Sequence, residues 1–137
     1  MTEKQILFYG CDDWTDTMLV FWRDLFRKCC PGTRFYQINN NDDFNDTLSS
    51  KNIDGIVIVF NPVLNRFDNA WSVLQKNKFY RDNRILYLAN TYGMERCRPY
   101  VRKNLDMLID FCNEDLQLVT DILLQYVKTG DLLSLAQ

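Results

Sequence analysis

The sequence predicts a three-layer α/β fold in which helices cover both faces of a mainly parallel, five-stranded sheet. Five short runs rich in β-branched and aromatic residues carry this prediction, at 5–9, 34–38, 55–60, 84–89 and 106–111. Helical patterns separate the runs, and such alternation is typical of parallel sheets. The run at 55–60, GIVIVF, is apolar throughout, as expected of a strand that is covered on both faces.

Each run ends in residues that favour turns, such as Gly10 or the pair Pro31 and Gly32. The clearest helical pattern, at 15–28, places its apolar side chains on one face and Arg23, Asp24, Arg27 and Lys28 on the opposite face. A similar pattern surrounds 67–74. The last one, at 115–128, ends before Gly130.

Two further helices are expected to be short. Phe44 and Leu48 are four residues apart, which predicts one short helix within the polar segment 39–52. A basic helix is predicted over 98–104, with Pro99 in its first turn. Right-handed crossovers between parallel strands would then place helices on both faces of the sheet.

The length of 137 residues suits one compact domain, which we place at 1–128. The remaining segment, 129–137, reads as an apolar tail because it carries Leu132, Leu133 and Leu135. Such a tail either packs back onto the domain or contacts another protein. Both alternatives remain open.

Composition narrows the function classes. The net charge of −2 gives no electrostatic reason to expect nucleic-acid binding. The chain has no histidine, and its five cysteines show no CxxC spacing, so neither a zinc site nor a disulfide framework is expected. The start of the chain lacks a signal-peptide pattern, and no apolar run is long enough for a membrane helix. A soluble intracellular protein is the expectation.

The turn after the first run tests for nucleotide binding. A phosphate loop would read G-x-x-x-x-G-K-S/T from Gly10. Here the second glycine is replaced by Thr15 and the lysine by Asp16, and Asp12 and Asp13 add two further carboxylates. Like charges at this place oppose phosphate binding. No catalytic, cofactor or metal site is therefore expected.

Two other chemistries also lack residues that they require. A guanine-reading motif beginning at Asn90 would need a lysine and an aspartate that the chain does not have, so Asn90 is expected to be a turn residue. Asp12 and Asp13 resemble the acidic pocket of a phospho-receiver. That chemistry also needs an aspartate ending the third strand and a lysine ending the fifth, where the sequence offers 59–61 and Asp110. Asp12 or Asp13 is more simply a helix cap.

Contact surfaces remain as candidates for function. Arg96, Arg98 and Arg102, with Lys103, form a basic cluster after the fourth run. Such a cluster is either a solvated helix face or a dock for an acidic partner. Together with Leu132, Leu133 and Leu135, these arginines are the predicted partner-binding residues.

Several segments together resemble the centromere protein M family, a pseudo-GTPase of the inner kinetochore. They are Ile6 to Gly10 followed by the acidic turn, Ile53 to Asn61, Phe79 and Leu86 to Ala89 with Glu95 to Cys97 after the loop, and Leu132 to Leu135. The resemblance implies a small-GTPase-like, Rossmann-like fold without nucleotide motifs and a non-catalytic scaffold. It also implies a nuclear, centromeric location and partners that include centromere protein I, a helical solenoid, with centromere proteins H and K.

Two alternatives share the predicted fold. One is a divergent Rab-like adaptor of the intraflagellar-transport type, and the other is a degenerate receiver-like domain. No cofactor, membrane contact or direct nucleic-acid contact is expected under the leading interpretation.

Overall fold

The computed structural model describes residues 4–10, 13–60 and 67–129, and within these ranges five strands form one sheet. The elements follow the chain as β1 (Lys4–Tyr9), α1 (Asp13–Cys29), β2 (Thr33–Ile38), α2 (Asn41–Ser50), β3 (Gly55–Phe60), α3 (Phe67–Gln75), α4 (Lys78–Asp82), β4 (Ile85–Ala89), α5 (Met94–Cys97), the 3-10 turn η1 (Arg98–Tyr100), β5 (Met107–Asp110) and α6 (Leu116–Thr129).

All strand pairs are parallel, in the order β2-β1-β3-β4-β5. This is the flavodoxin-like order of doubly wound α/β proteins. The register pairs Tyr9 with both Ile38 and Ile58, so the carboxyl ends of the first three strands lie together. The predicted three-layer α/β class with a parallel sheet is confirmed.

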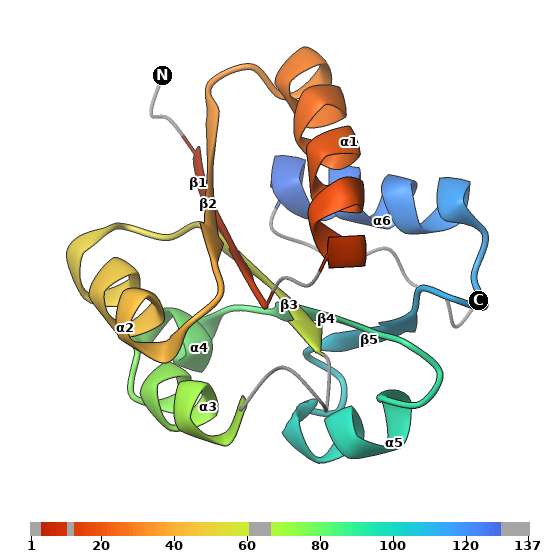
Figure 1. Ribbon diagram of the computed structural model, residues 1–137. Coiled ribbons are helices and arrows are strands. Elements are labelled where there is room, and N and C mark those ends of the chain that lie inside the picture. Colours follow the sequence, from red (N-terminus) through yellow and green to blue (C-terminus); the bar gives the residue numbers. More distant parts are fainter. Residues whose placement is uncertain (1–3, 11–12, 61–66, 130–137) are drawn as a thin grey trace.

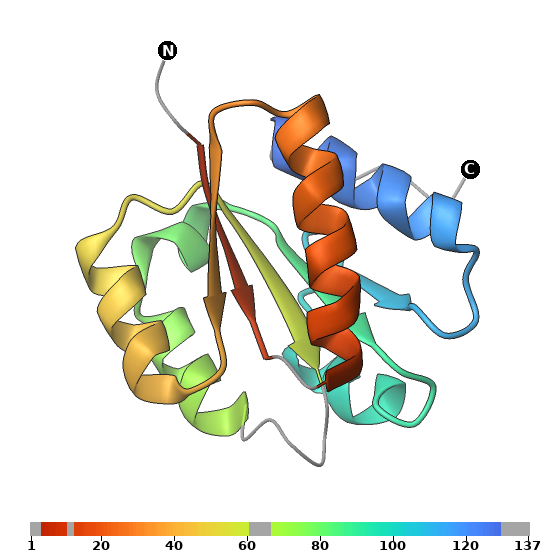
Figure 2. The same cartoon turned by 45° about the horizontal axis from the view of Figure 1, so that its top comes forward.

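Helices cover both faces of the sheet, as Figures 1 and 2 show: α1 and α6 lie on one face, and α2 to α5 lie on the other. Two separate hydrophobic cores result. One joins Trp22 and Phe26 of α1 to the α6 residues around Leu123, and the other joins Phe44 and Phe67 to the opposite side of the strands. Strands β3 and β4 are buried along their whole length, as the apolar run at 55–60 predicted.

Sequence patterns located most elements. The weak pattern at 39–52 forms the short helix that was predicted, α2, which the Asn40 side chain caps by accepting from the Asp43 backbone N–H. Helix α4 was not predicted. Asn77 caps its start, because the side-chain oxygen of Asn77 accepts from the Phe79 N–H.

The predicted basic helix at 98–104 is wrong. Helix α5 and the short turn η1 occupy 94–100, and the backbone then becomes extended at Val101. Asp106 explains the difference, because its carboxylate accepts from the Arg102 N–H at 2.9 Å and holds the chain in a loop. Asn104 within this loop has a φ of 67°, which a continuing helix does not allow.

A buried tyrosine joins α6 to the centre of the sheet. The Tyr126 hydroxyl accepts from the Ile56 N–H at 2.9 Å and donates to the Arg84 carbonyl at 2.6 Å. Burial raises the pKa of this hydroxyl, so it stays protonated.

We expect Tyr126→Phe to lower the free energy of unfolding by about 1–3 kcal/mol, because it leaves the buried Ile56 N–H without an acceptor. Urea denaturation measures this change. The matched control is Tyr92→Phe, since Tyr92 is 88% exposed and Tyr126 only 1%. That control should change stability by less than about 0.5 kcal/mol. Equal effects of the two substitutions would contradict the bridging role of Tyr126.

Candidate functional site at the carboxyl edge of the sheet

In an open α/β sheet, ligands bind beyond the carboxyl ends of the strands where the strand order reverses. Here that point lies between β1 and β3. Gly10 ends β1 with a φ of 85°, and its N–H donates to the Ile38 carbonyl at 2.8 Å. The side chains of Asp12, Asp13 and Asp16 lie outside the described residues, so the helix-cap hypothesis for this acidic turn stays a prediction.

The end of β3 presents a buried phenyl ring. Phe60 lies 5.9 Å from Phe67 of α3 in an edge-on arrangement and 5.8 Å from Tyr100 of η1, measured between ring centroids. Phe67 in turn lies 6.0 Å from Tyr9, so the ends of β1 and β3 share one aromatic cluster. Among the described residues, aromatic rings therefore fill this part of the carboxyl edge.

The end of β5 carries Asp110, whose carboxylate is occupied by its own turn. One oxygen accepts from the Cys112 N–H at 3.1 Å, and the other accepts from the Asn113 side-chain amide at 2.8 Å. The Asn113 amide also reaches the Thr91 hydroxyl at 3.2 Å, which links the turn to the end of β4. These bonds give Asp110 a local structural role.

The end of β4 confirms one sequence-based prediction. The side-chain oxygen of Asn90 accepts from the Gly93 N–H at 2.7 Å, and its backbone carbonyl accepts from the Met94 N–H at 3.1 Å. Asn90 is thus a turn residue that starts α5, as expected from its type.

Two side chains near this edge that could act as nucleophiles, the buried Cys97 and the partly buried Tyr100, are held in their neutral forms. Burial raises the pKa of the Cys97 thiol to about 12. Burial also raises the pKa of Tyr100 to about 12, assisted by its hydrogen bond to the Asp68 carboxylate and by the charge of that group. Neither group is a nucleophile at neutral pH. Among the described residues, no group of three or more histidine, cysteine or acidic side chains is arranged to hold a metal ion.

The predicted basic cluster divides into two kinds of residue. Arg102 forms a two-pronged ion pair with Asp106, with nitrogen-to-oxygen distances of 2.9 and 2.8 Å, and donates to the carbonyls of Tyr80 and Asn83. Its guanidinium also lies 3.8 Å from the centre of the Tyr80 ring. Arg102 therefore connects the β5 loop to α4 within the chain.

Arg96 and Arg98, by contrast, are exposed. Arg98 pairs with Glu95 at 3.0 Å, but the two side chains are 59% and 83% exposed, so solvent screens the pair. Partner binding by Arg96, Arg98 and Arg102 stays a prediction, and Arg102 has its donors already engaged. The other predicted contact residues, Leu132, Leu133 and Leu135, lie outside the described residues.

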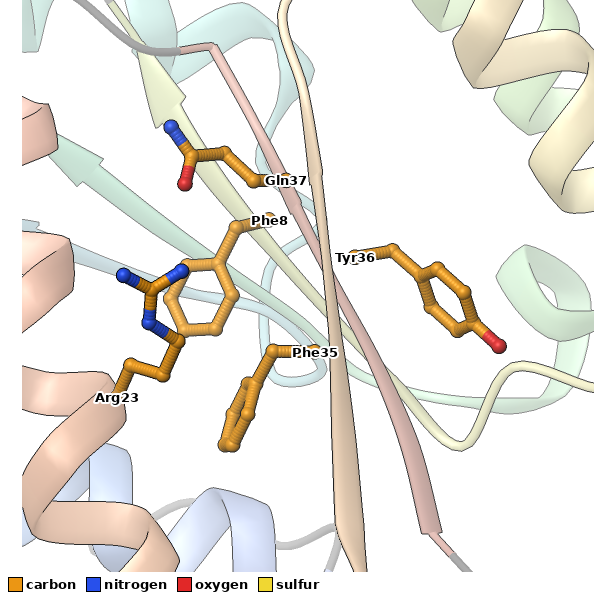
Figure 3. Close-up of a pocket in the computed structure, with 5 residues that line it drawn as sticks. All are labelled: Phe8, Arg23, Phe35, Tyr36 and Gln37. Carbon is orange, nitrogen blue, oxygen red and sulfur yellow. The ribbon is translucent and has the colours of Figure 1, made fainter.

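Sequence patterns also missed a cavity of about 30 Å³ between α1 and β2. Phe8, Arg23, Phe35, Tyr36 and Gln37 line it (Figure 3). The sequence placed Arg23 on the solvent face of its helix, which is wrong, because its Nε atom is inaccessible to solvent and has no hydrogen-bond partner. A buried donor without a partner costs about 1–3 kcal/mol, so this arrangement needs a reason.

Comparisons with known proteins agree on the fold alone. No protein-family model matches the chain, and no curated protein is similar to it in sequence. The structure is similar to that of a response regulator from Hahella chejuensis, with a TM-score of 0.68 and 13% identity over 92% of this chain and 96% of that one. It is also similar to a de novo designed Rossmann 2x3 fold protein, with a TM-score of 0.60 and 16% identity over 99% and 98% of the two chains.

Both identities are too low to indicate a shared activity, so the similarity concerns architecture. Within the described ranges, no helix has the length and apolar character needed to cross a membrane. The chain has a Rossmann-like parallel α/β fold that resembles a response-regulator receiver.

Substitution of Arg102 and of Arg98 should change the free energy of unfolding by different amounts. We expect Arg102→Ala to lower the free energy of unfolding by about 3 kcal/mol, because it leaves the fully buried Asp106 carboxylate without its cation. Arg98→Ala removes only an exposed pair and should cost less than about 1 kcal/mol. Chemical denaturation of the two variants checks both values. A small effect of Arg102→Ala would show that the charge is dispensable.

Proposed function

We propose that this chain is a degenerate receiver-like domain that acts by protein contact and carries out no phosphoryl or nucleotide chemistry. Phe60 carries the proposal. It occupies the end of β3, where a receiver needs its phosphate-accepting aspartate, and it packs into a cluster with Phe67 and Tyr100. A phenyl ring neither accepts a phosphoryl group nor ligates Mg²⁺, which takes oxygen ligands.

The end of β5 supports the same proposal through charge. A receiver needs a lysine there to stabilise the phosphoryl group, and this chain has Asp110. The Asp110 carboxylate already accepts bonds from its own turn. A negative group at this position repels a phosphoryl group instead of attracting it.

We expect the chain to remain unmodified when it is incubated with acetyl phosphate and Mg²⁺, because Phe60 and Asp110 supply neither the acceptor nor the cation. Intact-mass spectrometry detects a phosphoryl adduct, and thermal denaturation detects Mg²⁺ or GTP binding. We expect no adduct and no change in Tm with either ligand. A phosphorylated species, or stabilisation by millimolar Mg²⁺ acting through Asp12 and Asp13, would overturn the proposal.

The identity of the partner can be proposed from the sequence segments that resemble the centromere protein M family. On that basis the chain would be a scaffold subunit of the inner kinetochore, with centromere proteins I, H and K as partners. The support is the order and spacing of those segments along the chain, together with the missing phosphate loop. A receiver-like architecture is compatible with this role, because function resides in surface sites and not in the fold.

Co-expression tests this finer proposal. The chain should co-purify by size-exclusion chromatography with centromere protein I from the same organism, and a Leu132→Asp, Leu133→Asp variant should weaken that complex while leaving Tm unchanged. Apolar contacts contribute about 25 cal/mol per Å² buried, so two introduced carboxylates should oppose association strongly. Failure of the unmodified chain to form the complex would remove the kinetochore assignment and leave the receiver-like proposal in place.

A further inference from the structure

Strand β2 forms one border of the sheet and has β1 as its only strand neighbour in the described part of the chain. The Ile38 carbonyl accepts from the Gly10 N–H, so the peptide groups of Ile38 face β1. Peptide groups alternate in direction along a parallel strand. The N–H and C=O of Phe35, three residues earlier, therefore face away from β1.

Exposed sheet borders are usually protected against pairing by lysine, proline, bulges or a covering element. The segment Thr33–Ile38 reads TRFYQI, which contains neither lysine nor proline, and Arg34 is its only charged residue. All six residues pair with β1 in continuous register, so this border has no bulge. In Figures 1 and 2, no helix formed by the described residues covers its outer side. The border is therefore suited to accept another strand.

Arg23 lies beside this border. Figure 3 shows that Phe35 and Gln37 project from β2 toward Arg23, whereas Tyr36 projects to the opposite face. A strand added to β2 would place every second side chain on the Arg23 side, because side chains alternate between the faces of a sheet. The position opposite Phe35 would then lie closest to the cavity.

The cavity offers Arg23 no carboxylate from its own lining and has space for one small group. Its lining contains no acidic residue, and no hydrogen bond or ion pair engages the Arg23 guanidinium within the described residues. A volume of about 30 Å³ holds roughly two water molecules, which is comparable to a carboxylate group. Guanidinium groups pair preferentially with carboxylates through two parallel hydrogen bonds.

We propose that β2 binds an extended segment of a partner protein as a sixth strand, and that an aspartate or glutamate of this segment pairs with Arg23. Backbone bonds to the N–H and C=O of Phe35 provide general affinity, and the carboxylate provides specificity. Val20, which is 47% exposed and one helical turn before Arg23, supplies apolar contact beside the carboxylate. This inference rests on the proposed function, in which the domain acts by contact.

A second copy of the same chain fits this border less well. In a dimer paired through β2, a two-fold axis would relate the two copies. Both copies would then contribute the same strand and the same neighbouring residues to the interface. Such a dimer would bring a second Arg23 to the junction and, because the cavity lining contains no acidic residue, would supply no carboxylate to either cavity. Like charges at close range oppose such pairing.

The test uses the full chain, labelled with ¹⁵N, and a capped seven-residue probe peptide of alternating valine and threonine with one central glutamate. We expect the peptide to shift the Phe35 amide and the Arg23 side-chain resonances. Its Kd should weaken by about ten- to a hundredfold with Arg23→Gln, or when glutamine replaces the glutamate in the peptide, because hydrogen bonds to charged groups have this range of strength.

Two controls isolate the mechanism. Arg27→Gln removes an exposed charge one turn beyond Arg23, outside the cavity lining, and should change the Kd by less than about fivefold. Two further peptides carry N-methyl groups at either the odd or the even positions. One of them should lose binding, because only one set of N–H groups faces β2.

Three results would overturn the inference: no binding at millimolar peptide, equal binding by Arg23→Gln, or sedimentation of the chain as a dimer that the peptide dissociates, which would make a second copy of the chain the occupant of β2. The acetyl phosphate experiment on the same preparation distinguishes failure of the β2 site from failure of the proposed function. A lack of peptide binding without a phosphoryl adduct removes only the β2 site, whereas a phosphoryl adduct removes the proposed function.

Discussion

The arrangement of the two layers around the sheet depends on the hydroxyl of Tyr126. It lies on the buried face of α6, and it bonds to the backbone at the start of β3 and just before β4. Gly55 makes this approach possible. A Cβ atom there would lie 2.8 Å from the Ile6 Cδ1 atom and 3.2 Å from the Tyr126 ring. The position of α6 is thus set by one hydrogen-bonded group and one missing side chain, and the core around Leu123 packs on that arrangement.

Features of the fold that depend on a local sequence pattern were predictable, whereas features that depend on contacts between residues distant along the chain were not. Strands β3 and β4 were predictable because continuous apolar runs need cover on both faces. The loop at 101–106 was not predictable, since the buried Asp106 that shapes it looks like any other acidic residue in the sequence. The same limit applies to Arg102 and Arg98. Their spacing suggested one surface, but Arg102 bonds to the carbonyls of Tyr80 and Asn83, about twenty positions away along the chain.

The candidate site shows a similar division between local and distant causes. Turn chemistry identified Asn90 correctly, because its hydrogen bonds to Gly93 and Met94 lie within one turn. The sequence also predicted that Phe60 and Asp110 do not fit receiver chemistry, because that prediction needs only the identity of the residue that ends each strand. No sequence pattern pointed to the cavity beside β2. Helical periodicity placed Arg23 on the face opposite the apolar side chains, although it is only 100° around the helix axis from the buried Trp22.

The two unusual parts of the surface are related through the sheet itself. Rings fill the described part of the carboxyl edge at Tyr9, Phe60 and Phe67, so ligand chemistry there has little support. The lateral border at β2 combines outward peptide groups with a cation that has no partner among the described residues. A folded domain keeps an unpaired, partly buried guanidinium at a cost in stability. That cost is explained if a carboxylate arrives with a partner, because the pair then forms in a site that is already organised and largely shielded from water.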